Sequence, residues 1–511
     1  MFFNKTKKFD VVDLIPDHLR SGLAISDNKL CISSAIKAEP IVLEVYNDLL
    51  AQRVVSSFEL YKPTVFADKF SYNTLSSAQI MNEIQNFAID VWQEAFKQKA
   101  SDIHVKDMGT YGLIRFRIDG MLGDYKIIEA YRVRELIRTI YSTMCGNGDT
   151  GFSYRIRQDA RIINDNYLPK GMHSSRVHIE PTEKKDSPEG IGSCLYARLL
   201  YDIIKAAGSL ENRLAKLGFL KNQIETIQYL KKHSGLKVLA AKTGHGKSTV
   251  LKHIIECLHD ENPGKAFFSV EDPPEYHLEG VDQIAVNEKD SGGKREEAYA
   301  QTIAGVMRSN PDCLLIGEMR YSADISAGIN FAVSGHPVWT TFHASDAISI
   351  LLRMAIILGG KEMSNPLDYI CHKDVISGLE FQRLIPQLCP HCSKRLHAVI
   401  DNYDENMAER INRALYTEDD EVRVRGDGCE HCNHTGIKGQ QIAAEIIAPD
   451  VTFFNLIRQN KIEKAKEYWI KEQGGITHLQ HALQYVKNGN ADPFITEDIL
   501  GFPLDYEVMS R

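Results

Sequence analysis

The sequence contains no run of about 18 apolar residues, the length that a helix needs to cross a membrane. The first twenty residues have no long apolar core and no small-residue cleavage site, so we expect no secretory signal. The chain also has no strong excess of charge of one sign: 68 acidic and 60 basic residues give a net charge of −8. This balance argues weakly against nucleic acid as the main partner, since phosphate binding favours a basic face. Together these absences predict a cytoplasmic protein.

Cysteine is scarce, and most of the ten cysteines are scattered. Six have no shared spacing, and we expect them to be reduced core residues: Cys31, Cys145, Cys194, Cys257, Cys313 and Cys371. The other four form two C-x-x-C pairs: Cys389, Cys392, Cys429 and Cys432. Two such pairs are typical of a structural zinc site with four thiolate ligands. The alternatives are four buried cysteines without a metal, or a redox pair, although neither pair follows a thioredoxin-like strand.

The spacer between the two cysteine pairs has 36 residues, longer than the usual 15–20. We therefore expect a loop or a helical insertion between them.

The whole chain has 511 residues, which predicts two to four domains. We expect these ranges: 1–80, of unknown role; 81–200, an α+β domain; 201–214, a linker; 215–380, a nucleotide-binding core; 381–450, a zinc-binding module; and 451–511, a helical C-terminal region.

The central range alternates strands and helices, which predicts an α/β fold with a parallel sheet covered on both faces. Its first strand is followed by AKTGHGKST, which matches the phosphate-binding loop pattern except for Ala241 in place of the first glycine. In this pattern glycines let backbone N–H groups face a phosphate, and a helix N-terminus follows. Lys247 would contact the β- and γ-phosphates of ATP, and Ser248 would bind Mg²⁺. The expected nucleotide-binding residues are Thr243, Gly244, His245, Gly246, Lys247, Ser248 and Thr249, with His245 pointing outward.

Acidic residues follow two of the later strands. Glu271, in EDPPE, ends one predicted strand, and Glu318 ends another. Ligands bind at the carboxyl ends of strands in open α/β sheets, so both carboxylates are placed near the phosphates. There they could hold Mg²⁺ and orient the attacking water, and their individual roles stay open. His343 follows the next strand, where it could contact a γ-phosphate or be structural.

These motifs together resemble the ATPases of type II secretion and type IV pilus assembly over residues 95–450. The matching segments, in the family's order, are SDIH, RFRIDG, RQDARI, TGHGKST, EDPPE, RSNPDCLLIGEMR, SGHPVWTTFHASDA, QRLIPQLCPHC and GCEHCNHTG. The resemblance implies a RecA-like ATPase core, a preceding PAS-like domain and a homohexamer. It implies a protein at the cytoplasmic face of the inner membrane that acts with a polytopic platform protein and pilus or secretion machinery. It also implies that the cysteine module favours assembly over retraction.

The resemblance further implies roles for individual residues. Glu271 and Glu318 are similar to the acidic-box carboxylates and His343 to a sensor histidine. Arg161 and Arg176 are similar to arginines that reach the γ-phosphate from the preceding domain. The chain departs from the family at Ala241, at His245, where serine is usual, and at Tyr321 and Ala323, where Asp and Glu are usual. These departures suggest the type IVb or conjugative thin-pilus branch. A nucleic-acid motor and a nucleotide sensor that does not hydrolyse ATP are the alternatives.

Overall fold

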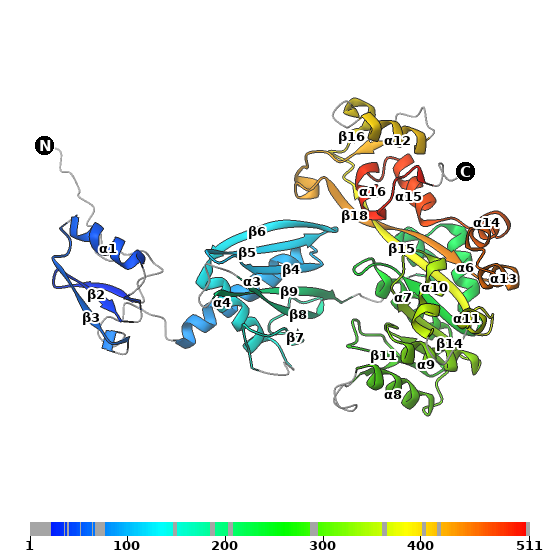
Figure 1. The fold of residues 1–511 in the computed structure, drawn as a ribbon, viewed down its shortest axis with the longest axis horizontal. Helices are drawn as coiled ribbons and strands as arrows, with labels where there is room; N and C mark the ends of the chain where they lie inside the picture. Colours follow the sequence, from blue (N-terminus) through cyan, green and yellow to red (C-terminus); the bar gives the residue numbers. More distant parts are fainter. Residues whose placement is uncertain are drawn as a thin grey trace. The chain divides into compact units, whose positions relative to one another are not determined.

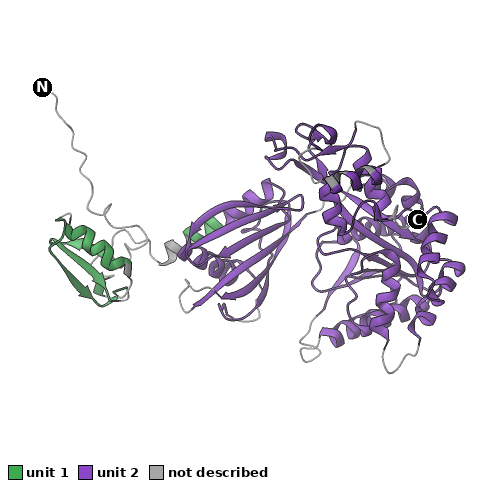
Figure 2. Cartoon of the chain, turned by 45° about the horizontal axis from the view of Figure 1, so that its top comes forward, with its two compact units in different colours: residues 1–88 green, residues 89–511 purple. Residues whose placement is uncertain are grey.

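The computed structural model divides into two compact units, residues 1–88 and 89–511 (Figure 2). The residues that it describes are 22–34, 36–37, 40–51, 53–63, 65–66, 77–146, 151–183, 190–202, 208–286, 295–359, 365–400, 405–415 and 421–506. Part of the expected linker, residues 203–207, and the first 21 residues lie outside them. Within the described part of the chain, no helix is both long and apolar enough for a membrane span.

The first unit is built around a small three-stranded sheet. Its elements are β1 (Leu23–Ser26), β2 (Lys29–Ser33), α1 (Pro40–Ala51) and β3 (Ser57–Tyr61). β2 is the central strand, antiparallel to β1 and parallel to β3. Leu23 and Leu30 of the sheet pack against Val42 and Leu49 of α1, so the unit has its own apolar core.

The second unit begins with an antiparallel six-stranded sheet of order β6-β5-β4-β9-β8-β7. Its strands are β4 (Asp102–Asp107), β5 (Tyr111–Ile118), β6 (Met121–Glu129), β7 (Gln158–Ile162), β8 (Met172–Glu183) and β9 (Ile191–Tyr201). It is accompanied by α4 (Ala130–Thr139) and by the part of α3 (Ser77–Lys97) that begins at Ile89, and α4 packs against β4, β5 and β9 (Figure 1). The side chains of Val91, Trp92 and Ala95 place the apolar side of α3 in the core.

A seven-stranded sheet of order β12-β11-β13-β14-β10-β15-β18 forms the centre of the remaining chain (Figure 1). Its strands are β10 (Gly235–Ala240), β11 (Phe267–Glu271), β12 (Val281–Ala285), β13 (Cys313–Ile316), β14 (Pro337–Phe342), β15 (Ile376–Leu388) and β18 (Ile437–Ile447). The first six are parallel, as predicted, whereas β18 is antiparallel to β15. The ranges expected for the core and for the cysteine module share this sheet, because β15 crosses residue 380 and β18 lies beyond it.

Helices cover both faces of this sheet. One face carries α5 (Leu210–Leu217), α6 (Lys221–Lys231) and α7 (Lys247–Glu261). The other carries α8 (Arg295–Met307), α9 (Ser322–Val333), α10 (Ala347–Leu358), α11 (Pro366–Ile370), α13 (Val451–Arg458) and α14 (Ile462–Glu472). Successive residues of a strand point to opposite faces of the sheet: Val238 packs with the second group of helices and Leu239 with the first. This alternation follows from the two-residue period of a strand.

A third core lies where β15 and β18 extend beyond the rest of the sheet. It is formed with the two-stranded sheet of β16 (Lys394–Arg395) and β17 (Arg423–Val424), and with α12 (Glu405–Leu415), α15 (His478–Lys487) and α16 (Pro493–Leu500). We call this part the C-terminal lobe. The predicted helical insertion between the cysteine pairs is present as α12.

Candidate active site

The phosphate-binding loop joins β10 to α7, as its motif requires. Gly244 and Gly246 have φ of 80° and 79°, a backbone region open to glycine at little cost. Lys247 is the first residue of α7, and burial lowers the pKa of its ammonium to about 8, against the nearby negative charges of Glu318 and Glu275. The lysine therefore lies near Glu318, which the sequence pattern indicated, and near Glu275 of the EDPPE segment.

The prediction that His245 points outward is wrong. Its Nδ1 accepts a hydrogen bond from the backbone N–H of Leu384, 2.9 Å away, and its carbonyl accepts one from the Gln382 side chain. Both partners belong to β15, more than 130 residues further along the chain. Burial, together with the charges of Arg383, Lys242 and Lys247, lowers the pKa of His245 to about 4, so the imidazole is neutral. The half-buried side chain turns toward β15, where the backbone N–H of Leu384 is available as a donor.

Glu318 and His343 form a close pair at the carboxyl ends of β13 and β14. His343 Nε2 is 2.7 Å from Glu318 Oε1, and Arg320 donates to Glu318 Oε2 at 2.5 Å. Burial alone would raise the pKa of Glu318, but the two bonds outweigh burial and lower the pKa to about 2. Glu318 is therefore ionised, and His343 is tied to it.

Glu271 lies beside Glu318 in a different environment. Its Oε1 accepts hydrogen bonds from Ser269 Oγ at 2.7 Å and Gln283 Nε2 at 3.1 Å. Burial raises its pKa, and these neutral donors only partly oppose the effect. Gly317, next to Glu318, makes the close approach possible, because a Cβ there would lie 3.1 Å from Glu271 Cγ.

The two predicted arginines lie opposite each other on β7 and β8. Arg161 pairs with Arg176 in the strand register, so both side chains leave the same face of the six-stranded sheet. Arg161 donates to Ser174 Oγ at 2.7 Å. Burial lowers its pKa, while the charges of Glu275 and Glu271 favour its charged form. Arg176 is exposed.

Sequence reasoning missed three partners of the acidic residues. Arg320 holds Glu318, and Gln283 and Ser269 hold Glu271. Arg320 lies inside the RSNPDCLLIGEMR segment, so its position was visible, although its role was not. Gln283 belongs to β12, an edge strand outside every motif, and carried no signal.

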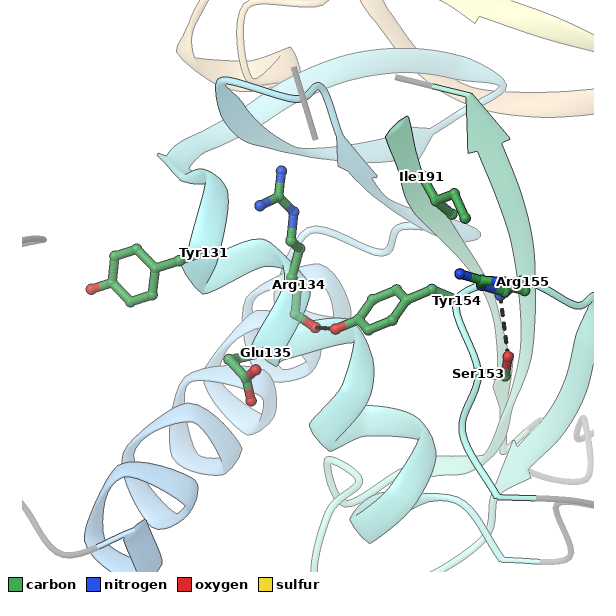
Figure 3. Close-up of a pocket in the computed structure, with 7 residues that line it drawn as sticks. All are labelled: Tyr131, Arg134, Glu135, Ser153, Tyr154, Arg155 and Ile191. Atoms are coloured by element: carbon green, nitrogen blue, oxygen red, sulfur yellow. Dashed lines mark hydrogen bonds between the residues drawn. The ribbon is translucent and has the colours of Figure 1, made fainter. Parts of the chain in front are cut away.

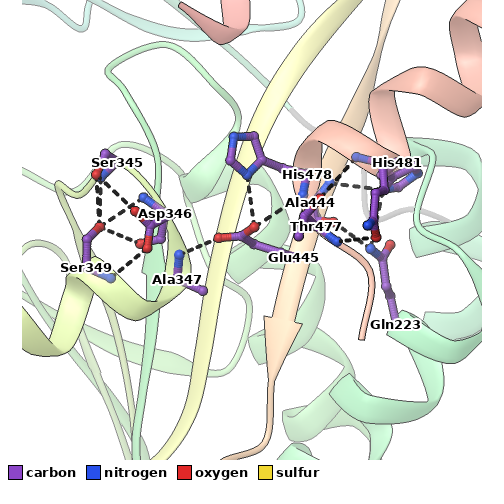
Figure 4. A network of polar contacts seen from close by, with 11 residues as sticks. Gln223, Ser345, Asp346, Ala347, Ser349, Ala444, Glu445, Thr477, His478 and His481 are labelled. Carbon is purple, nitrogen blue, oxygen red and sulfur yellow. Dashed lines mark hydrogen bonds and ion pairs between the residues drawn. The ribbon is translucent and has the colours of Figure 1, made fainter. Parts of the chain in front are cut away.

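A buried carboxylate supports the segment that follows His343 (Figure 4). Glu445 of β18 accepts hydrogen bonds from the backbone N–H of Ala347 at 2.5 Å, from the backbone N–H of His478 at 3.2 Å and from His478 Nδ1 at 2.9 Å. Ala347 and His478 are the first residues of α10 and α15. One negative charge thus serves two positive helix N-termini. The hydrogen bonds and the His478 charge lower the pKa of Glu445 despite its burial.

The four paired cysteines converge in the C-terminal lobe. Their Sγ atoms all lie within 4.8 Å of one another, and the pairs Cys389–Cys429 and Cys392–Cys432 are each 3.8 Å apart. Four thiolates around one Zn²⁺ with bonds of about 2.3 Å would be separated by about 3.8 Å. Backbone N–H groups of Cys429 and Gly436 also donate to Cys432 Sγ. This arrangement could hold a metal ion.

A separate pocket of about 530 Å³ lies on the six-stranded sheet domain (Figure 3). Tyr131 and Arg134 of α4 line one side, and Tyr154 lines the other. Arg134 is bound to Asp107 at 2.8 Å, and the Tyr154 hydroxyl donates to the Arg134 carbonyl. The predicted nucleotide-binding residues are not among those that line this pocket.

The sheet, the loop and the acidic residues define an α/β nucleotide-binding protein of the P-loop class. The family model "Type II/IV secretion system protein" matches residues 77–500, and the chain belongs to this family. The resemblance seen in the motifs is confirmed, and the chain is an ATPase of the type II secretion and type IV pilus class.

Curated relatives agree with this placement. The chain is 28% identical over 380 residues to "Type II secretion system protein E" of Aeromonas hydrophila, covering 74% of this chain and 68% of the relative. It is also 28% identical over 412 residues to "Type IV pilus assembly ATPase TfpB" of Acinetobacter baylyi, covering 78% and 64%. The chain thus spans about two thirds of the length of these relatives.

Solved structures show the same fold. The pilus retraction motor PilT with bound ADP superposes with a TM-score of 0.52 at 19% identity, covering 82% of this chain and 99% of that one. The ATPase DotB of Legionella pneumophila gives a TM-score of 0.53 at 17% identity, covering 81% and 95%. At these identities the likeness supports the fold alone.

Proposed function

We propose that this chain hydrolyses ATP in a homohexameric ring at the cytoplasmic face of the inner membrane, and powers type IV pilus assembly or type II-like secretion. The observation that carries the proposal is the meeting of Lys247, Glu271 and the Glu318–His343 pair at one edge of the sheet. Lysine, two carboxylates and a histidine supply what phosphoryl transfer to water requires. Family membership supports the pilus or secretion context.

Within this proposal, the loop residues Thr243, Gly244, His245, Gly246, Lys247, Ser248 and Thr249 surround the phosphates of ATP, and the Ser248 hydroxyl binds Mg²⁺. Glu271 is the general base, because its raised pKa makes it the stronger proton acceptor. Glu318, held ionised by its hydrogen bonds with His343 and Arg320, orients Mg²⁺ and its water. His343 senses the γ-phosphate through its contact with Glu318. Arg161 and Arg176 stabilise charge on the transferred phosphoryl group, either within one chain or between neighbours.

The wider architecture follows from the same proposal. The seven-stranded part is a RecA-like motor core, and the six-stranded part is the PAS-like domain that closes on it. The four thiols of the C-terminal lobe hold structural Zn²⁺, since their spacing fits tetrahedral thiolate coordination. A polytopic platform protein of the inner membrane would receive the motion, and no direct nucleic-acid partner is needed.

The two carboxylates provide the test. Glu271→Gln and Glu318→Gln keep the size of the side chain and remove the charge needed for proton transfer or Mg²⁺. Each variant should bind ATP and lose turnover by about 100-fold or more. Glu225→Gln, at an exposed position of α6, is the matched control and should keep the wild-type rate. Full turnover by both active-site variants, measured as phosphate release, would rule out the acid assignment.

A further inference from the structure

β15 runs alongside the phosphate-binding loop after its neighbour β10 has ended. The pairing of β10 with β15 stops at Ala240 and Phe381, where β10 gives way to the loop. β15 continues to Leu388, paired on its other side with β18, and Cys389 follows directly. One strand therefore passes from the core, past the loop, into the lobe that holds the four cysteines.

Beyond the end of β10, His245 provides the hydrogen-bond acceptor that a further β10 residue would have provided. The backbone N–H of Leu384 has no β10 residue to pair with, and it donates to His245 Nδ1 at 2.9 Å instead. The Gln382 side chain donates to the His245 carbonyl, which fastens the loop from a second direction. The loop is so close to β15 that a Cβ at Gly246 would lie 3.3 Å from Gln382 Nε2. The strand is thus joined to the loop in two ways: the Leu384 backbone binds the His245 side chain, and the Gln382 side chain binds the His245 backbone carbonyl.

The chemistry of this contact depends on the length of the side chain. An acceptor two bonds beyond Cβ, as in Nδ1 of histidine, reaches the strand, whereas the hydroxyl of the serine usual in the family lies one bond beyond Cβ. The imidazole also has to be neutral to accept a hydrogen bond. Burial beside Arg383, Lys242 and Lys247 keeps it so.

We propose that His245 is a positioning residue that clamps the phosphate-binding loop to β15, so that nucleotide binding in the loop is transmitted along β15 to the tetracysteine lobe. The inference rests on the proposed role of the loop as the ATP site. His245 acts through the loop backbone and takes no part in bond making. When ATP binds and orders the loop, the hydrogen bond from Leu384 to His245 restrains β15 at Leu384. This restraint extends along the strand to Leu388 and Cys389.

Three substitutions separate the clamp from a merely structural histidine. His245→Ala removes the acceptor. His245→Asn keeps an acceptor where Nδ1 lies, and His245→Gln moves it one bond further out. The Leu384 amide should exchange with deuterium about tenfold faster in His245→Ala, with protection restored by Asn and not by Gln. The KM for ATP should rise about tenfold in the Ala variant, more than kcat falls, with the same order of rescue.

The transmission is tested by hydrogen exchange of residues 382–388 in the full chain with and without Mg-ATP. Wild type and His245→Asn should show slower exchange with nucleotide, and His245→Ala should show no change there while still binding ATP. Unchanged exchange at Leu384 in His245→Ala, or equal rescue by Asn and Gln, would overturn the clamp. A wild-type chain that binds no ATP in calorimetry would overturn the proposed function as well, so the two failures are distinguishable.

Discussion

The acidic residues of the site differ because of their immediate neighbours. Glu318 contacts the guanidinium of Arg320 at 2.5 Å and the imidazole of His343 at 2.7 Å, whereas Glu271 accepts hydrogen bonds from the neutral side chains of Ser269 and Gln283. Two carboxylates on adjacent strands thereby acquire opposite pKa shifts. In the proposed function, this divergence lets Glu318 act as a fixed charge and Glu271 as a proton acceptor.

A third carboxylate, Glu380 of β15, gives a prediction about stability. It is 4% exposed, its Oε1 has no hydrogen-bond partner among the described residues, and burial raises its pKa from 4.5 to about 8. Between these pH values Glu380 loses its proton in the unfolded chain and keeps it in the folded chain. Its contribution to the free energy of unfolding therefore falls as pH rises. Glu380→Gln removes the ionisable group, so its stability relative to wild type should increase as pH rises through this range.

Thermal unfolding at pH 5 and pH 8 checks the Glu380 prediction. The melting temperature of Glu380→Gln should exceed that of wild type by a margin that grows from pH 5 to pH 8. Glu225→Gln, which changes an exposed carboxylate, should show no such growth. A margin that is the same at both pH values would show that Glu380 is not the source of the effect.

The positions of the site residues could be predicted from sequence where a motif contains them. The orientations of their side chains could not. The position of Lys247 at the start of α7 followed from the loop pattern. The direction of His245 did not, because its partner Leu384 lies 139 residues away in the chain. Arg320 lay in a recognised segment, but nothing local shows that its guanidinium turns back to Glu318.

At the scale of elements, β18 joins parts of the fold that are far apart in sequence. It pairs with β15, and through Glu445 it holds the N-termini of α10 and α15. The segment containing His343 and the C-terminal helices are thus fixed to the same strand. An antiparallel strand at this edge was not expected from the alternation of strands and helices, because its partner precedes it by a whole cysteine-rich insertion.

The tetracysteine group predicts one Zn²⁺ per chain. Metal analysis of the purified chain should find it, and Cys389→Ser/Cys392→Ser should lose it. Because binding energy at such a site is folding energy, this variant should become sensitive to proteolysis within residues 389–436 while the core still binds ATP. Cys145→Ser, which changes a cysteine outside the group, is the control. Unchanged zinc content in the double variant would refute the assignment.

At the scale of the molecule, the family was predictable from the motifs, and the family model matches residues 77–500. The strand–helix alternation was sufficient for the α/β sheet because its period is local. Residues 22–66 carry no motif, and their three-stranded sheet depends on pairing between β2 and β3 across the intervening helix. Such non-local pairing leaves little trace in a single sequence.

Phosphate release from Mg-ATP by the full-length chain, measured over a range of protein concentrations, tests the central claim most directly. A ring ATPase should show specific activity that rises with concentration, and Lys247→Ala should abolish it, because the ammonium contacts the β- and γ-phosphates. Arg161→Ala should lower turnover more than ATP affinity. Hydrolysis by Lys247→Ala at the wild-type rate, or full wild-type activity in a monomer independent of concentration, would contradict the account.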